Sequence, residues 1–156
     1  MHRFVARGAL VVALLAPAAC GSAGTSSSPQ KASGFKTSFN SVVTHFKQTS
    51  KAIGNEINHA PTQTNGQIAT HFKHLAGRWQ GSLSRLETLK APADVATKLN
   101  TLTGAATRTE SDLNAIVAAA RADSASAAKQ ASATLVTDIL SAKTASQQIS
   151  NALRGS

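Results

Sequence analysis

Residues 68–89 read IATHFKHLAGRWQGSLSRLETL, and the spacing of their apolar side chains indicates the fold class. Its apolar side chains recur every three or four positions, at Ile68, Phe72, Leu75, Trp79, Leu83, Leu86 and Leu89. Such steps place side chains on one face of an α-helix, whereas a half-buried strand alternates every second residue. The stretch therefore predicts a long amphipathic helix with Trp79 in the core. An exposed Trp79 would instead indicate a binding anchor.

Three further stretches have the same spacing. The one before carries Phe35, Phe39, Val42, Phe46, Ile53 and Ile57. The two after it are richer in alanine and carry Val95, Leu99, Leu102, Ala106, Leu113, Ile116 and Ala120, then Ala128, Ala131, Leu135, Ile139, Ala142, Ile149 and Leu153. Thr49, Thr109 and Ser146 fill gaps in these stripes. We expect helices over residues 35–59, 64–90, 93–121 and 125–153.

The breaks between the four stretches contain helix-terminating residues. Pro61 lies within HAPTQTNGQ (residues 59–67), Pro92 suits the first turn of the third helix, and Asp123 and Ser124 are N-cap candidates. Short connections make sequential helices pack antiparallel. Residues 35–156 are therefore predicted to form an all-α, antiparallel up-down-up-down four-helix bundle. The alternative is two long helical hairpins that pair with another molecule.

The composition supports this fold class. Of the 156 residues, 42% are hydrophobic, only 4% are aromatic, and none is tyrosine. Few aromatic and β-branched residues disfavour an all-β fold. The single cysteine excludes an internal disulfide framework and the Cys-x-x-Cys-His motif of covalent haem attachment. The sequence contains no run of about 20 apolar residues, so it predicts no membrane-spanning helix.

The N-terminal region has the composition of an export signal. Arg3 and Arg7 form a basic start, and residues 9–19 form a short apolar run that ends in small side chains. This pattern predicts a secretory signal peptide over residues 1–19. Residues 21–34 read GSAGTSSSPQKASG, which cannot bury a core, so we expect residues 20–34 to form a flexible tether.

The sequence Leu14-Leu15-Ala16-Pro17-Ala18-Ala19-Cys20-Gly21 resembles the lipobox of bacterial lipoprotein precursors. The resemblance implies that the Cys20 thiol receives a diacylglyceryl group and that a signal peptidase cleaves just before Cys20. It further implies a protein lipid-anchored at the extracytoplasmic face of the cell membrane. Two or more acyl chains bind a membrane stably, whereas one binds it marginally. The alternative is a plain secreted protein with Cys20 as an incidental thiol.

Positive charge is concentrated in the first half of the domain. The 16 basic residues outnumber the 7 acidic ones, which gives a net charge of +9. Residues 20–91 hold a net charge of +6 and residues 92–156 hold +1. The predicted basic surface comprises Lys36, Lys47, Lys51, Lys73, Arg78, Arg85 and Lys90. It predicts anionic lipid head groups or acidic wall polymers as partners, since export disfavours nucleic acid. The alternative is a solvated face that keeps the domain soluble.

Histidines offer the one candidate metal site. His71 and His74 are three residues apart on adjacent faces of one helix and could hold a metal if His45 contributed from the first helix. Glu56 and His59 have the Glu-x-x-His spacing of di-iron bundles, but the second such pair is lacking. We therefore expect solvent-facing histidines and no cofactor, with His71 and His74 as the metal alternative.

No catalytic constellation is predicted. The seven acidic residues are scattered over the four helices, and we expect no close carboxylate pair for acid–base chemistry. An all-helical chain also lacks the strand that precedes a phosphate-binding loop. The sequence therefore predicts a protein that is not an enzyme.

Together these features predict a membrane-anchored extracytoplasmic lipoprotein that acts as a non-catalytic cell-envelope interaction or structural module. The first alternative is a carrier of a lipid or other small apolar ligand, or of a metal at His71 and His74. The second alternative is an enzyme of unknown class. An open apolar groove between helices would favour the carrier, and a closed bundle with a basic outer face would favour the interaction module.

Overall fold

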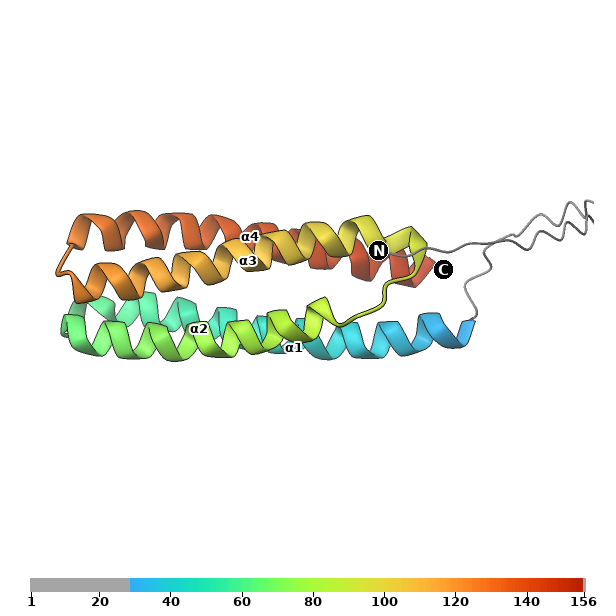
Figure 1. Cartoon of the computed structure of the whole chain (residues 1–156), viewed down its shortest axis with the longest axis horizontal. Helices are drawn as coiled ribbons and strands as arrows, with labels where there is room; N and C mark the ends of the chain where they lie inside the picture. The colour runs from blue at the N-terminus through green and yellow to red at the C-terminus, as the bar shows by residue number, and fades with distance from the viewer. Residues whose placement is uncertain (1–28, 156) are drawn as a thin grey trace, which may run out of the picture.

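The computed structural model describes residues 29–155, which form four long helices joined by short connections. The elements are α1 (Pro29–His59), a 3₁₀ turn η1 (Ala60–Thr62), α2 (Asn65–Glu87), α3 (Ala93–Arg121) and α4 (Ala125–Gly155). Figure 1 shows the helices running alternately in opposite directions along one axis. This confirms the predicted up-down-up-down four-helix bundle. Among the described residues, no helix has the length and apolarity needed to cross a bilayer.

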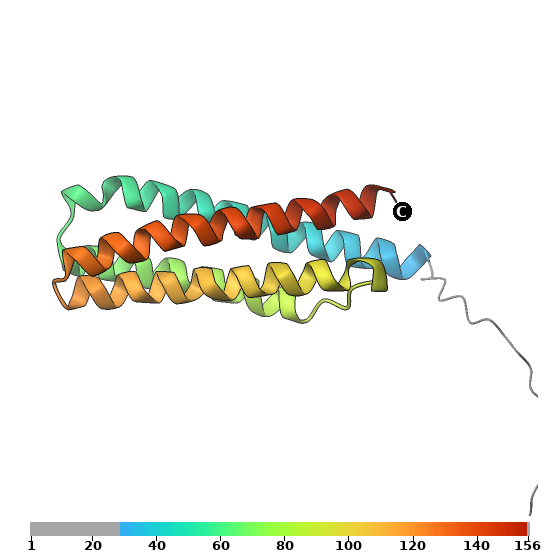
Figure 2. The same ribbon diagram turned by 90° about the horizontal axis from the view of Figure 1, so that it is seen from above.

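Each helix packs against its neighbour in sequence, and the ring closes between the first and last helices. The α3–α4 contact is the most extensive, whereas α1 touches α4 only lightly. Figures 1 and 2 show the start of α1, the α2–α3 connection and the end of α4 at one end of the bundle. The four apolar faces therefore meet within one chain.

The predicted stripes form the core. Phe39, Leu86, Val95, Leu113 and Leu135 are fully buried. Trp79 is only 1% exposed, which confirms its predicted place in the core. The three hydroxyl residues that fill gaps in the stripes, Thr49, Thr109 and Ser146, are also buried. The 3.6-residue period in the sequence thus predicts which side chains face inward.

The helix ends at the far side of the bundle are fixed by side chains. Thr64 and Gln67 form a capping box at the start of α2, where the Thr64 hydroxyl accepts from the Gln67 amide and the Gln67 side chain accepts from the Thr64 amide. Asp123 has a left-handed backbone with a φ of 53° and accepts a hydrogen bond from the Asn65 side chain. The prediction that Asp123 caps α4 is therefore wrong, because α4 begins two residues later and the Asp123 side chain instead joins the α3–α4 connection to the start of α2.

Four boundaries differ from the expected ones, by one residue at the start of α2, by two at the end of α4, and by more at the start of α1 and the end of α2. The helix α1 begins at Pro29, so residues 29–34, which we expected in the tether, are helical. Proline favours the first position of a helix because its missing N–H would have no partner there. The helix α2 ends at Glu87 rather than at residue 90, and a 3₁₀-type hydrogen bond from the Leu89 amide to the Leu86 carbonyl closes its last turn. The predicted signal peptide over residues 1–19 and Cys20 lie outside the described residues.

Candidate ligand-binding groove

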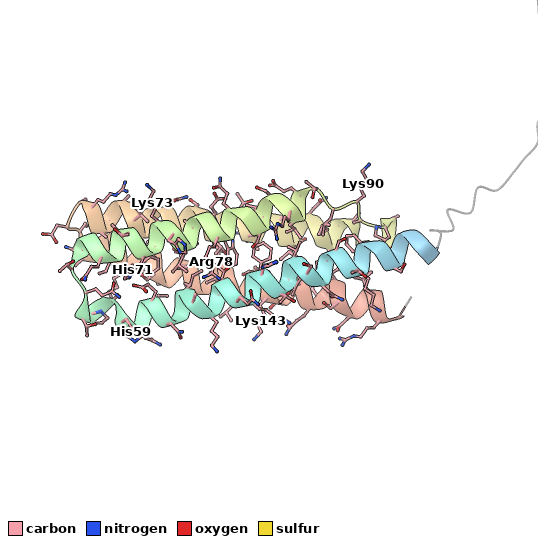
Figure 3. All side chains as sticks on the ribbon, turned by 90° about the horizontal axis from the view of Figure 1, so that it is seen from below. His59, His71, Lys73, Arg78, Lys90 and Lys143 are labelled. Atoms are coloured by element: carbon pink, nitrogen blue, oxygen red, sulfur yellow. The ribbon has the colours of Figure 1, made fainter. Side chains whose placement is uncertain are left out.

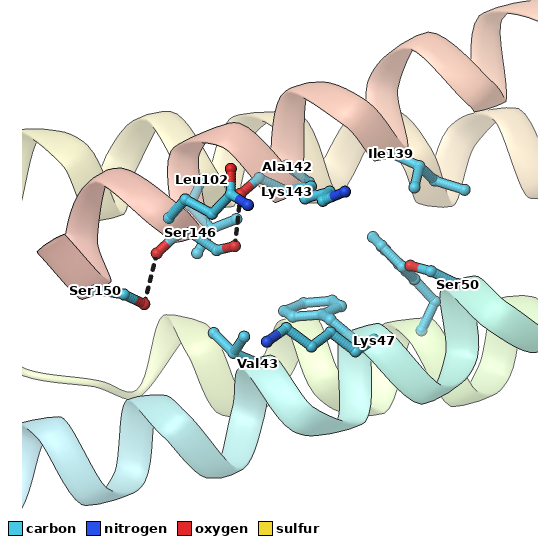
Figure 4. A pocket seen from close by; sticks show the side chains of 12 residues that line it. Val43, Lys47, Ser50, Leu102, Ile139, Ala142, Lys143, Ser146 and Ser150 are labelled. Carbon is cyan, nitrogen blue, oxygen red and sulfur yellow. Dashed lines mark hydrogen bonds between the residues drawn. The ribbon is translucent and has the colours of Figure 1, made fainter.

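The contact between α1 and α4 is open. Toward α1, α4 presents Ala142, Ser146 and Ser150, which are too small to fill the space that larger apolar residues occupy in a closed bundle. The result is an apolar compartment of about 340 Å³. Small-molecule sites typically measure roughly 300–1,000 Å³ and often lie between bundle helices. Figure 4 shows its lining, which comprises Val43, Phe46, Lys47, Ser50, Trp79, Leu102, Ile139, Ala142, Lys143, Ser146, Gln147 and Ser150.

Trp79 forms the floor of the apolar compartment and is held from three helices. Its indole Nε1 donates a hydrogen bond to the Ala106 carbonyl of α3 at 2.8 Å. Its ring packs against Phe46 of α1, with the centroids 4.6 Å apart and the planes inclined by 55°. Because the indole N–H is bonded to Ala106 and the side chain is only 1% exposed, Trp79 presents no polar group to the compartment.

The serines on the α4 wall use their hydroxyl hydrogens within the helix. Ser146 Oγ donates to the Lys143 carbonyl at 2.8 Å, and Ser150 Oγ donates to the Ser146 carbonyl at 2.9 Å (Figure 4). Neither hydroxyl is left as an unpaired donor that would penalise an apolar occupant. The α4 wall therefore consists of small side chains whose hydroxyl donors are already bonded, although serine is a polar residue.

Two lysines border the apolar compartment from opposite sides. Lys47 extends from α1 and Lys143 from α4 (Figure 4). Among the described residues, neither ammonium group has an ion-pair partner within 4 Å. The compartment contains no acidic side chain. The rim therefore carries positive charge that the protein itself does not neutralise.

A polar compartment of about 370 Å³ continues the opening toward the end of α4. It shares Lys47, Gln147 and Ser150 with the apolar compartment and adds Lys36, Asn40, Asn151, Leu153 and Arg154. The Lys36 ammonium donates to the Leu153 carbonyl at 3.3 Å, and the Arg154 guanidinium donates to the Asn151 side chain. We call the two compartments together the α1–α4 groove.

The predicted basic surface is divided by the fold. All seven side chains are exposed. Lys36 and Lys47 line the α1–α4 groove, whereas Lys51, Lys73, Arg78, Arg85 and Lys90 do not. Lys143 and Arg154 of α4 complete the basic lining, and the sequence reasoning missed them. Their place in the lining depends on the first and last helices being neighbours in this topology, which the charge of either half of the sequence does not show.

The histidines are not gathered into a cluster. His71 Nδ1 lies 2.8 Å from Glu56 Oε1, so Glu56 joins α1 to α2. His45, His59 and His74 are exposed, and Figure 3 shows His59 and His71 at the same end of the bundle. Within residues 29–155, no three histidine, cysteine or acidic side chains are grouped to hold a metal ion. A metal at His71 and His74 stays a prediction.

The acidic residues differ from expectation. We expected no close carboxylate pair, but Asp112 of α3 interacts with Asp138 of α4. Burial, together with the Asp138 charge, raises the pKa of Asp112 above its ordinary value of 3.8, against a lowering by the Thr134 hydrogen bond. Asp138 is held by Arg108 at 3.0 Å. This pair lies on the α3–α4 seam, outside the α1–α4 groove.

Comparisons with protein families, with curated proteins and with solved structures find no match for the chain. The geometry of the α1–α4 groove is therefore the basis for a functional proposal.

Proposed function

We propose that this protein is a membrane-anchored, non-catalytic carrier that holds a small apolar ligand in the α1–α4 groove. The observation that carries the proposal is the open apolar compartment over Phe46, Trp79 and Leu102. Phe46, Trp79 and Leu102 are themselves buried, and the open space lies above them because the facing α4 side chains are small. An apolar ligand gains free energy by moving its own apolar surface from water into this compartment, at roughly 25 cal/mol per Å².

The lining of the groove supports binding rather than catalysis. It supplies apolar, hydroxyl, amide and cationic groups, with no carboxylate, imidazole or thiol. General acid–base catalysis at neutral pH depends on groups whose pKa lies near that pH. The groove therefore has the chemistry to retain a ligand unchanged.

The anchor is proposed from the sequence of the N-terminal region. The resemblance of residues 14–21 to a lipobox supports acylation of Cys20 and a location at the extracytoplasmic face of the cell membrane. The nine-residue step from Cys20 to Pro29 spans at most about 30 Å when fully extended. An anchored bundle would stay close to the lipid surface, where apolar ligands are abundant.

Intrinsic fluorescence tests the proposal, because Trp79 is the single tryptophan and the chain has no tyrosine. We would titrate the full chain carrying Cys20→Ser, which cannot be acylated, with dodecanol. The expected result is a saturable change in Trp79 emission at one ligand per protein. An emission spectrum that stays constant up to the solubility limit of dodecanol would overturn the proposal.

A pair of variants on one helix controls for non-specific binding. Ser146→Leu places a branched apolar side chain inside the apolar compartment, whereas Thr144→Leu places the same side chain on the exposed face of α4. We expect Ser146→Leu to abolish the saturable change and Thr144→Leu to retain it. Equal binding by both variants would place the dodecanol elsewhere.

A further inference from the structure

We infer that the ligand is a single-chain amphiphile with an anionic head group, and that this head group binds in the polar compartment beside Lys36, Lys47 and Arg154. The inference rests on the proposed function, because it assigns the second half of the same groove. It names the class of ligand and the direction in which the ligand lies.

The lining of the groove changes from apolar to polar along its length. Phe46, Trp79, Leu102 and Ile139 make the first compartment apolar, whereas lysine, arginine and amide side chains make the second one polar. Lys47 belongs to both and marks the boundary. An elongated groove with an apolar half and a cationic half is complementary to a molecule that has an alkyl chain at one end and a negative charge at the other.

The charge of the polar compartment is one-sided. Lys36, Lys47 and Arg154 line it, and no aspartate or glutamate does. Lys36 uses one of its three donors on the Leu153 carbonyl, and Arg154 uses part of its guanidinium on Asn151. Both cations are thereby positioned at the groove while they retain N–H groups for another acceptor. A phosphate or carboxylate offers the several acceptor oxygens that such donors match.

The apolar end of the groove continues on the surface of α4. Val136 and Leu140 are 47% and 55% exposed, and they are the large hydrophobic side chains that the described residues leave exposed. On a helix they share a stripe with Lys143 and Gln147, which line the apolar compartment. An alkyl chain longer than the compartment would cover Leu140 and Val136, so the tail points away from Lys36 and Arg154.

Dodecyl compounds that differ only in the head group test the inference. The full chain with Cys20→Ser is titrated at low ionic strength with dodecyl phosphate, dodecanoate, dodecanol and dodecyltrimethylammonium, with Trp79 emission as the readout. Charge-assisted hydrogen bonds predict that at least one anion binds about tenfold more tightly than the alcohol. A preference for the phosphate would indicate a lysophospholipid, and a preference for the carboxylate would indicate a free fatty acid.

The variants separate the head-group site from a general charge effect. The double variant Lys36→Gln/Arg154→Gln should reduce the preference for the anion over dodecanol to about twofold and leave the Kd of dodecanol unchanged. The matched double variant Arg121→Gln/Lys129→Gln removes the same charge from exposed positions outside the groove and should retain the preference. Lys143→Gln, in the apolar compartment, should affect the preference less than the first variant does.

Each failure has a distinct meaning. If dodecanol binds and both anions bind no more tightly, the head-group inference is overturned while the carrier proposal stands. If none of the four compounds changes Trp79 emission, both proposals fail. Tighter binding of the ammonium compound, or an equal loss of preference in the two double variants, also overturns the head-group inference.

Discussion

The two seams of α4 show what decides whether antiparallel helices close on each other. Toward α3 the contact is extensive, and small residues such as Ala105 on α3 and Ala145 on α4 are buried on both helices, while Ala119 and Ala131 border an open surface hollow. Toward α1 the contact is light, because small residues on α4 meet Val43 and Phe46 on α1. Small side chains bring two backbones together only when both partners are small. When the side chains of one helix are large and an aromatic ring among them packs against a third helix, empty space remains between the first two helices.

Two truncations on α4 should show the largest difference in stability between its two seams. Leu135 is fully buried, whereas Ile139, one turn further on, lines the groove and is only partly buried. We expect Leu135→Ala to lower the free energy of unfolding by about 2–5 kcal/mol, and Ile139→Ala to lower it by about 1 kcal/mol, because the groove side already has space around it. Urea unfolding followed by circular dichroism measures both values. Equal losses would mean that the α1–α4 seam is as well packed as the rest.

Replacement of Trp79 tests how the floor of the groove is held. Trp79→Phe removes the 2.8 Å hydrogen bond to Ala106 and leaves a small void. We expect a loss of about 1–3 kcal/mol in the free energy of unfolding. Thermal unfolding followed by circular dichroism gives the measurement, since the variant has no tryptophan. An unchanged midpoint would show that Trp79 does not connect α2 to α3 in solution.

A substitution that fills the space at the α1–α4 seam should stabilise the folded protein. Ser146→Leu fills space that α4 leaves empty, so we expect the free energy of unfolding to rise by about 1 kcal/mol, as cavity-filling changes commonly give. Thr144→Leu on the exposed face should change it by less than about 0.5 kcal/mol. Urea titrations of both variants give the values. A destabilised Ser146→Leu variant would mean that the groove is already filled by its own side chains.

The smallest effect concerns pH and the α3–α4 seam. Because the pKa of Asp112 is raised in the folded protein, the native state binds protons more tightly than the unfolded state there. The Asp112 contribution to stability therefore falls as the pH rises above 3.8, toward the raised value. Asp112→Asn should stabilise the protein at pH 7 by at most about 1 kcal/mol, and this advantage should vanish at pH 3. An advantage equal at both pH values would assign the effect to packing.

The helices were predictable because their signal is local. The stripes that contain Phe72, Leu102 and Leu135 repeat every three or four residues, and the predicted boundary of α3 at residues 93–121 matches the structure. The start of α1 was not predictable from composition, because Gly34 and several serines suggest a tether, whereas Pro29 can begin a helix. Local patterns locate a helix, but its ends depend on what it packs against.

The α1–α4 groove could not be read from any single segment. It arises because Ser146 faces Val43 and Phe46, which lie about a hundred positions earlier in the chain. Lys143 also fell in the half of the sequence that is nearly neutral, so its proximity to Lys47 was hidden. Likewise, the Asp112–Asp138 pair depends on the register between α3 and α4. Sites of this kind follow from which helices are neighbours and how large their facing side chains are.

The light α1–α4 contact also has a consequence for motion. Because α1 packs closely only against α2, we expect α1 to separate from the bundle at a lower free energy than α3 does. Its amide hydrogens should therefore exchange with solvent faster than those of α3, which has two firm neighbours. Since detachment of α1 removes one wall of the groove, the same opening would admit a ligand. An occupant that bridges α1 and α4 should then slow hydrogen exchange in α1 more than in α3.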